Sequence, residues 1–149
     1  MQLKNYIKVF DTLRKPVNTM ERQNLEKMYP YYGAQGIVDF INEYIFDGEY
    51  ILLAEDGANL LTKSEPLANL VKGKFWVNNH AHVFQTNNLM NQKYLYYWLN
   101  SKNLDGYITG SAQPKLNQEN LLSIEINPPS LDDQQHIVNT ISSLLLKFL

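Results

Sequence analysis

Short segments rich in β-branched and aromatic residues, separated by turn residues, cluster in the first two thirds of the chain. No other feature constrains the fold as much, because such side chains fit the pleated, half-buried surface of a sheet. The dipeptide Asp47-Gly48 predicts a turn between two of these segments. The strands predicted in this way are residues 37–41, 44–46, 50–54, 74–77 and 81–84.

The last third of the chain favours helices. Residues 91–101 carry apolar side chains with helical spacing, and residues 117–122 suit a shorter helix. Residues 123–127 alternate like a strand that the following two prolines end. Because strands and helices do not strictly alternate, we expect an α+β fold, with a mixed, largely antiparallel sheet and packed helices.

The clearest local pattern is an amphipathic segment at residues 131–149. Asp132 and Asp133 suit the first turn of a helix, where the helix dipole favours negative charge. Apolar residues then recur at spacings of four, three and four, which predicts one apolar stripe for pairing with another helix. The stripe consists of Ile137, Ile141, Leu144 and Phe148.

Composition excludes several classes of protein. The 149 residues suffice for one core, and 44% hydrophobic against 19% charged residues is typical of a folded domain. Cysteine is absent, which excludes disulfides, thiolate metal sites and a cysteine nucleophile. The net charge of −2 means that any nucleic-acid binding has to come from local patches.

Nothing in the sequence indicates export or a membrane. The first residues lack the apolar stretch of a signal peptide, and no apolar run is long enough to span a bilayer. We therefore expect a cytoplasmic protein with no membrane partner.

Asn127-Pro128-Pro129 is similar to the loop with which amino methyltransferases hold the exocyclic nitrogen of a flipped base. However, Ser130 stands where an aromatic residue would stack on that base, and no glycine-rich turn for a methyl-donor cofactor is present. The favoured interpretation is a connection between two elements that the prolines terminate.

His80 and His82 could form a second chemical site. On a strand both imidazoles would share one face, a spacing that can ligate zinc, and Glu55 and Asp56 could add carboxylates. A further ligand at diagnostic spacing is missing, so hydrogen-bonded structural histidines are favoured and no metal is predicted. No catalytic residues are predicted either.

Several predicted loops carry side chains that suit DNA, among them the aromatic and glycine-rich residues 29–36, for which we expect a structured loop. Arginine and lysine contact phosphates or guanine, whereas asparagine and glutamine suit adenine edges. The candidate phosphate or guanine contacts are Arg14, Lys15, Lys63 and Lys115. The candidate base readers are Gln35, Asn59, Asn79 and Gln113. Each segment alone is more typical of a solvated loop than of a DNA contact.

An ordered set of motifs runs along nearly the whole chain: FDTLRKPV (10–17), YPYYGAQGIVD (29–39) with FDG (46–48), LAEDGA (53–58), WVNNHAHV (76–83), YLYYWL (94–99), GSAQPKLN (110–117), Leu121, IEINPP (124–129) and LDDQQHIV (131–138). Together they resemble the target recognition domain of the specificity subunit of Type I restriction-modification systems. The last motif is similar to the Leu-x-x-Gln-Gln-x-Ile start of that family's long spacer helix.

The resemblance implies a non-catalytic domain that binds double-stranded DNA and no cofactor. In the family, a specificity subunit carries two such domains, each reading one half of a split target, with long helices between them. By similarity, residues 1–130 would be the recognition domain and residues 131–149 the start of a spacer or dimerisation helix. The chain would direct methyltransferase and restriction subunits, and the methyltransferase would bind S-adenosylmethionine and methylate a flipped adenine.

Other functions stay open on the sequence alone. A small methyltransferase fragment could use the Asn-Pro-Pro motif, and the acidic balance would suit a protein-interaction domain without DNA reading. A single recognition domain fits a half-size subunit that forms a homodimer through the C-terminal helix, a truncated product or a fragment. Such a dimer would read an inverted repeat, because two-fold protein symmetry imposes two-fold symmetry on the site.

Overall fold

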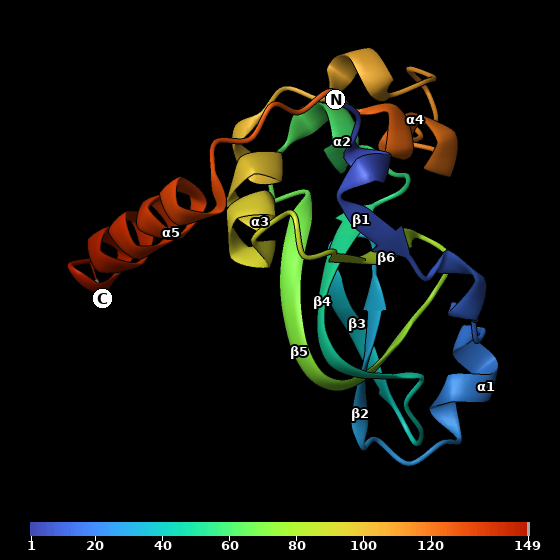
Figure 1. Cartoon of the computed structure of the whole chain (residues 1–149). Helices are drawn as coiled ribbons and strands as arrows, with labels where there is room; N and C mark the ends of the chain where they lie inside the picture. Colours follow the sequence, from blue (N-terminus) through green and yellow to red (C-terminus); the bar gives the residue numbers. More distant parts are fainter. Residues whose placement is uncertain (149) are drawn as a thin grey trace.

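The computed structural model describes residues 1–148 and contains a six-stranded sheet in the order β1-β6-β4-β5-β2-β3 (Figure 1). Neighbouring strands are antiparallel except β2 and β5, which are parallel. This confirms the predicted α+β fold with a mixed, largely antiparallel sheet. The strands are β1 (Ile7–Val9), β2 (Tyr29–Gly33), β3 (Gly36–Ile41), β4 (Phe46–Ala54), β5 (Ala68–Val77) and β6 (Ala81–Thr86).

Within residues 1–148, four of the five α-helices begin at a side-chain cap, including the helices that follow Asn91 and Ser130. The side chain of Asn91 accepts a hydrogen bond from the Tyr94 amide, and that of Ser130 accepts one from the Asp133 amide. The predicted helices near residues 91–101, 117–122 and 131–149 are confirmed over the described residues. The α-helices are α1 (Thr19–Gln23), α2 (Asn59–Thr62), α3 (Gln92–Ser101), α4 (Gln118–Ser123) and α5 (Leu131–Leu146), and the 3₁₀ helices are Leu3–Asn5, Asp11–Leu13 and Asp105–Tyr107.

The sheet separates two apolar clusters, as the alternation along β4 requires. Ile51 and Leu53 belong to the larger cluster, which also includes buried leucines of α3 and α4. Leu52 points to the other face and joins a smaller cluster with Phe46 and Phe75, whose rings are stacked at 5.4 Å. The sheet is therefore buried on both faces along its central strands.

The structure corrects the turn predicted at Asp47-Gly48, since both residues lie inside β4. Gly48 pairs with Gly73 of β5, and both have positive φ angles, of 148° and 116°. Figure 1 shows β4 and β5 as long, strongly curved strands. Pairing along the whole β4–β5 ladder thus overrides the local turn preference, and the turn to β4 comes earlier, between residues 42 and 45.

Two other local predictions were wrong. Residues 29–36 form the β2–β3 hairpin rather than a loop, with Ala34 and Gln35 at the turn. Residues 123–127 form no ladder strand: Ile124 and Ile126 are buried, but only an isolated bridge between Gln2 and Glu125 pairs this segment. The alternation reflects one-sided burial of an extended chain.

Helix α5 projects from the body beside α3 (Figure 1), and it docks through two buried residues, Gln134 and Val138. Gln134 accepts a hydrogen bond from the Asn91 amide at 2.8 Å and donates one to the Pro129 carbonyl at 2.9 Å. The predicted stripe lies beside this docked face and not in it. Its members are mostly exposed: Ile137 by 37%, Leu144 by 49% and Phe148 by 86%, with Ile141 half-buried.

No helix within residues 1–148 has both the length and the apolar character needed to cross a bilayer.

Candidate nucleic-acid interface

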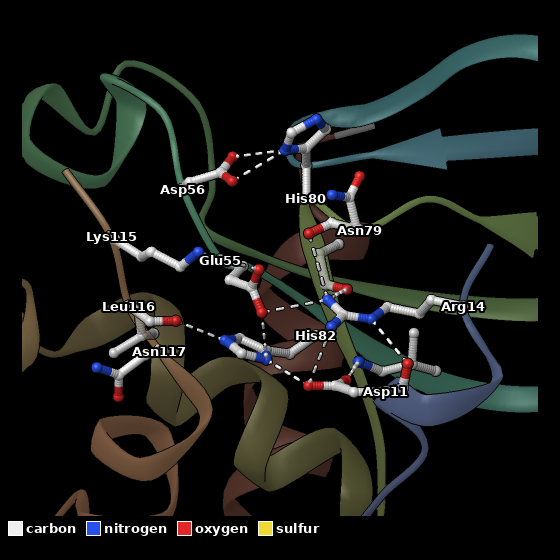
Figure 2. Close-up of polar contacts among 12 residues, drawn as sticks. Asp11, Arg14, Glu55, Asp56, Asn79, His80, His82, Lys115, Leu116 and Asn117 are labelled. Atoms are coloured by element: carbon white, nitrogen blue, oxygen red, sulfur yellow. Dashed lines mark hydrogen bonds and ion pairs between the residues drawn. The ribbon is translucent and has the colours of Figure 1, made fainter. Parts of the chain in front are cut away.

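A buried ionic cluster of Asp11, Arg14, Glu55 and His82, here called the clasp, lies where several loops meet (Figure 2). The His82 ring is fully buried, with Nδ1 2.7 Å from Asp11 Oδ2 and Nε2 2.6 Å from the Leu116 carbonyl oxygen. A carbonyl and an ionised carboxylate can only accept hydrogen bonds. Both ring nitrogens thus face acceptors, so the ring is held between the Asp11 side chain and the backbone just before α4.

Arg14 completes the clasp and joins three segments. Its guanidinium Nη1 lies 3.2 Å from Glu55 Oε1 and 2.9 Å from the Ala81 carbonyl oxygen, and a longer contact of 3.4 Å reaches the Asn79 carbonyl. Its Nε donates to the Asp11 carbonyl at 3.0 Å. Two carboxylates thus face the Arg14 guanidinium and the His82 ring inside the protein, and each buried carboxylate has a partner.

The clasp has a set of donors that could hold a metal ion, since ligand atoms of Asp11, Glu55 and His82 lie within 4.8 Å of one another. The chemistry of the cluster argues against this use. Arg14 already contacts the carboxylate of Glu55, and an added divalent cation would be repelled by the guanidinium. We therefore assign the cluster a positioning role.

Loops held by the clasp form a continuous surface, here called the loop face, which comprises residues 16–22, 34–35, 56–58, 78–80 and 112–115. Three shallow hollows of about 390, 440 and 350 Å³ follow one another across it. Asp56 lines the first and third hollows, and His80 lines the second and third. The loop face is thus one surface assembled from five separate parts of the chain.

The structure brings most of the residues that the sequence suggested as DNA contacts onto or beside the loop face. Gln35 lies at the hairpin turn, Asn79 precedes β6, and Gln113 and Lys115 belong to the loop before α4; all four side chains are exposed. Lys15 is exposed beside them, and its backbone is anchored because its carbonyl accepts from Trp76 Nε1 at 2.7 Å. Their roles in binding stay predictions.

Of the three remaining candidates, Arg14 belongs to the clasp and the other two lie elsewhere. Asn59 is only 3% exposed, and its amide is used within the protein by Ser64 and Glu65. Lys63 forms an ion pair with Asp105 at 2.9 Å and lines a separate hollow near the C-terminal end of α3. We therefore withdraw Asn59 and Lys63 from the candidate contacts and assign Arg14, whose side chain is 14% exposed, to positioning.

The two histidines do not share a face, contrary to the prediction. His80 lies in the turn before β6 and is exposed, whereas His82 points into the clasp. His80 Nδ1 instead lies 3.0 and 2.9 Å from the two carboxylate oxygens of Asp56. The sequence favoured hydrogen-bonded structural histidines over metal ligands, but nothing in it indicated that each histidine pairs with its own acid.

The Asn-Pro-Pro motif, residues 127–129, accepts hydrogen bonds from other parts of the protein. Asn127 Oδ1 accepts from the N-terminal amine at 3.2 Å, and the Pro129 carbonyl accepts from Gln134 at the start of α5. The motif therefore connects the body to α5, which removes the observation that favoured a methyltransferase site.

A second ionic group supports the far end of the loop face. Arg22 lies over the ring of Tyr31 at 4.6 Å and pairs with Asp39 at 2.8 Å. The backbone N–H of Phe40, together with Lys27 and Arg22, holds the pKa of Asp39 below its ordinary value. The segment containing α1 is thereby fastened to the β2–β3 hairpin.

Comparison with known proteins identifies the family. The family of Type I restriction modification DNA specificity domains matches residues 5–148. The chain belongs to this family. Among curated relatives, it is 35% identical over 136 residues to the type I restriction enzyme specificity subunit S.HindORF215P of Haemophilus influenzae, a match that covers 91% of this chain and 34% of the relative.

The Escherichia coli type I restriction enzyme EcoprrI specificity subunit is 30% identical over 120 residues, which cover 80% of this chain and 29% of that protein. This specificity domain thus spans about a third of the length of both curated relatives. The prediction of a specificity component, and not an enzyme, agrees with both names.

Solved structures share the fold of this specificity domain. The S subunit from M. genitalium superposes with a TM-score of 0.75 at 16% identity, covering 96% of this chain and 37% of that one. The HsdS subunit from Thermoanaerobacter tengcongensis has a TM-score of 0.60 at 12% identity, covering 99% and 37%. At such identities the similarity establishes the fold alone.

Proposed function

We propose that this specificity domain reads one half of a split double-stranded DNA target through its loop face. One observation carries the proposal: in a chain of a DNA specificity family, loops distant in sequence bring exposed amide and lysine side chains onto one surface. The clasp contacts the backbone at Asn79 and Leu116, so the segments that carry Asn79 and Gln113 keep a constant spacing. Constant spacing is what direct readout of base edges requires.

The exposed side chains divide by chemistry. Gln35, Asn79 and Gln113 each combine a hydrogen-bond donor with an acceptor, and this pair suits the N6 and N7 edge of adenine. Lys15 and Lys115 suit phosphates, which position a protein on DNA without specifying sequence. The loop face also contains acids, so we expect modest affinity and a shallow dependence on salt.

We also propose an assembly. Residues 1–130 act as the recognition domain, and residues from 131 onward begin a spacer helix that pairs through the stripe of Ile137, Ile141, Leu144 and Phe148. Leu149, included in the predicted helix, lies outside the described residues. The partners are a second recognition domain or a second copy of this chain, together with methyltransferase and restriction subunits in the cytoplasm. S-adenosylmethionine binds to the methyltransferase subunit.

Selection of duplexes from a random pool by the purified chain tests the central proposal. We expect enrichment of one short half-site, and an inverted repeat if the chain forms a homodimer. Gln113→Ala should cost about 1–3 kcal/mol of discrimination at one base pair. Gln118→Ala is the matched control, because Gln118 is an exposed glutamine on α4 outside the loop face.

Phosphate contacts have a different signature. Lys115→Ala should weaken binding to all sequences alike and reduce the slope of log affinity against log salt by about 1. Lys93→Ala on α3 is its control, since Lys93 is exposed and outside the loop face. Stable helix pairing with no DNA binding at any salt concentration, even with the methyltransferase subunit added, would contradict the proposal and favour a protein-interaction domain.

A further inference from the structure

Asp56 and His80 form a pair that connects the hollows of the loop face, because Asp56 lines the first and third hollows and His80 lines the second and third. Asp56 follows β4 and His80 precedes β6, so two separate segments supply the pair. Both carboxylate oxygens of Asp56 lie within 3.0 Å of His80 Nδ1, and the two side chains are 31% and 51% exposed. Neither residue belongs to the clasp, and the fold does not need an exposed ion pair of this kind, which contributes little to stability.

Backbone hydrogen bonds hold the pair rigidly. The Glu55 amide donates to the His80 carbonyl at 2.9 Å, and the His80 amide donates to Asn78 Oδ1 at 2.8 Å. Next to Asp56, the Gly57 amide donates to the Pro114 carbonyl at 3.2 Å. A side chain mounted in this way loses little conformational entropy when it binds a ligand.

The carboxylate also determines which nitrogen of His80 is available. Asp56 accepts a hydrogen bond from Nδ1, so Nδ1 carries a hydrogen whether or not the ring is charged. Figure 2 shows the other ring nitrogen directed away from Asp56, and within residues 1–148 Nε2 has no hydrogen-bond partner. The pair therefore offers a single directed polar atom, which accepts in the neutral ring and donates in the charged ring.

The neighbours of His80 favour a base edge over a phosphate as the ligand. Asp56 lines the same hollow as Gln35, and its negative charge repels a phosphate that approaches Nε2 closely. The nearest predicted readers, Asn79 and Gln35, carry neutral amides. A polar group of a base in the major groove carries no full negative charge and meets no such repulsion.

We infer that His80, held by Asp56, contacts a base edge through Nε2 and determines specificity at one base pair of the half-site. The inference rests on the proposed DNA recognition and adds a reader that the sequence pattern did not indicate. Asp56 is a positioning residue in this arrangement, because it acts through the orientation of the imidazole.

Selection and quantitative binding with variants of the full chain test the inference. His80→Ala should reduce discrimination at one base pair about tenfold, the value expected for one directed hydrogen bond. Preferences at the other positions and the salt dependence should be unchanged. His136→Ala on α5 is the matched control, because His136 is an exposed histidine outside the loop face.

A double-mutant cycle separates positioning from direct contact. Asp56→Ala should weaken discrimination at the same base pair, and Asp56→Ala with His80→Ala should be no worse there than His80→Ala alone. Asp56→Asn should recover part of the loss, since its amide oxygen can still accept from Nδ1. Unchanged thermal unfolding midpoints would exclude a general loss of fold as the cause.

Three results would overturn the inference. The first is a His80→Ala variant that keeps the wild-type base preference at every position of the half-site. The second is an equal loss of affinity for all sequences with a smaller slope of log affinity against log salt, which would identify a phosphate contact. In both cases the wild-type chain still selects a half-site, so the proposed function stands. If the wild-type chain selects no half-site with its methyltransferase subunit present, the proposed function fails and the inference fails with it.

Discussion

Replacing Asp11 by alanine would remove one carboxylate that contacts two members of the clasp and one backbone amide. Its Oδ2 lies 2.7 Å from His82 Nδ1 and 3.8 Å from Arg14, and its Oδ1 accepts from the Val83 amide at 2.8 Å. The carboxylate side chain is only 5% exposed, so water cannot replace these contacts freely. Asp11→Ala would leave the buried His82 ring and the Val83 amide without their shared acceptor.

The expected cost follows from these contacts. Breaking a buried ion pair from one side typically costs about 3–5 kcal/mol, and a single unpaired buried donor about 1–3 kcal/mol. We expect the free energy of unfolding to fall by about 3–5 kcal/mol, which is a large part of the ~5–15 kcal/mol of a typical domain. The unfolding midpoint should fall by about 6–20 °C at this chain length.

Urea unfolding followed by circular dichroism measures the loss, provided that the m-value stays constant. In a cycle with His82→Ala, the double variant should lose clearly less stability than the sum of the two single variants, because both remove the same interaction. Asp47→Ala, at an exposed acid of β4, should stay within about 0.5 kcal/mol of the wild type. A loss below about 1 kcal/mol for Asp11→Ala, or full additivity in the cycle, would refute the assignment of the clasp.

Other regions of the molecule provide three further tests. The folded-state pKa of Asp39 is below its ordinary value of 3.8, so its carboxylate stabilises the fold above that value, and this contribution is lost as the pH falls through the folded-state pKa. Asp39→Asn should therefore lower the free energy of unfolding at pH 6 and have a smaller effect in acid. Urea titrations at both pH values measure the difference. Val138→Asp buries a charge under α5 and should weaken the docking of this helix by about 2 kcal/mol or more. The expected sign is fast amide hydrogen exchange confined to α5, and amide protection equal to that of the wild type would contradict the docking. Gly110 has a φ of 78°, and a Cβ there would lie 2.7 Å from the Gln113 carbonyl oxygen. Gly110→Ala should therefore lower the free energy of unfolding by about 1–3 kcal/mol and reduce the base discrimination assigned to Gln113. A variant with wild-type stability and wild-type selectivity would contradict this loop geometry.

Patterns that act over a few residues could be predicted from the sequence. The spacing of apolar residues indicated α3 and α5, and the caps Asn91 and Ser130 explain where they begin. Strand-forming segments were found within β3, β4, β5 and β6, but β1 and β2 were not predicted. The ordered motifs indicated the family, which the comparison confirmed.

The tertiary structure decided which candidate side chains are free to meet a ligand. Arg14 and Asn59 had the polar groups expected of DNA-contacting loop residues. In the structure these groups form hydrogen bonds within the protein, with residues distant in sequence or in the next loop. His80 and Asp56 gained a new interpretation because two loops 24 positions apart bring them into contact. A polar residue alone does not indicate whether its partner is water, DNA or the protein itself.

The same division explains the errors in the fold. Asp47-Gly48 has the local signature of a turn, yet the long ladder between β4 and β5 keeps it in a strand. The parallel pairing of β2 with β5 has no local signature, because a crossover depends on the packing of the intervening elements. The sequence by itself thus determined the periodicities, the caps and the family, since these depend on neighbouring residues. Only the tertiary structure decided strand order, the clasp and the exposed readers, because their free energy comes from contacts between distant segments.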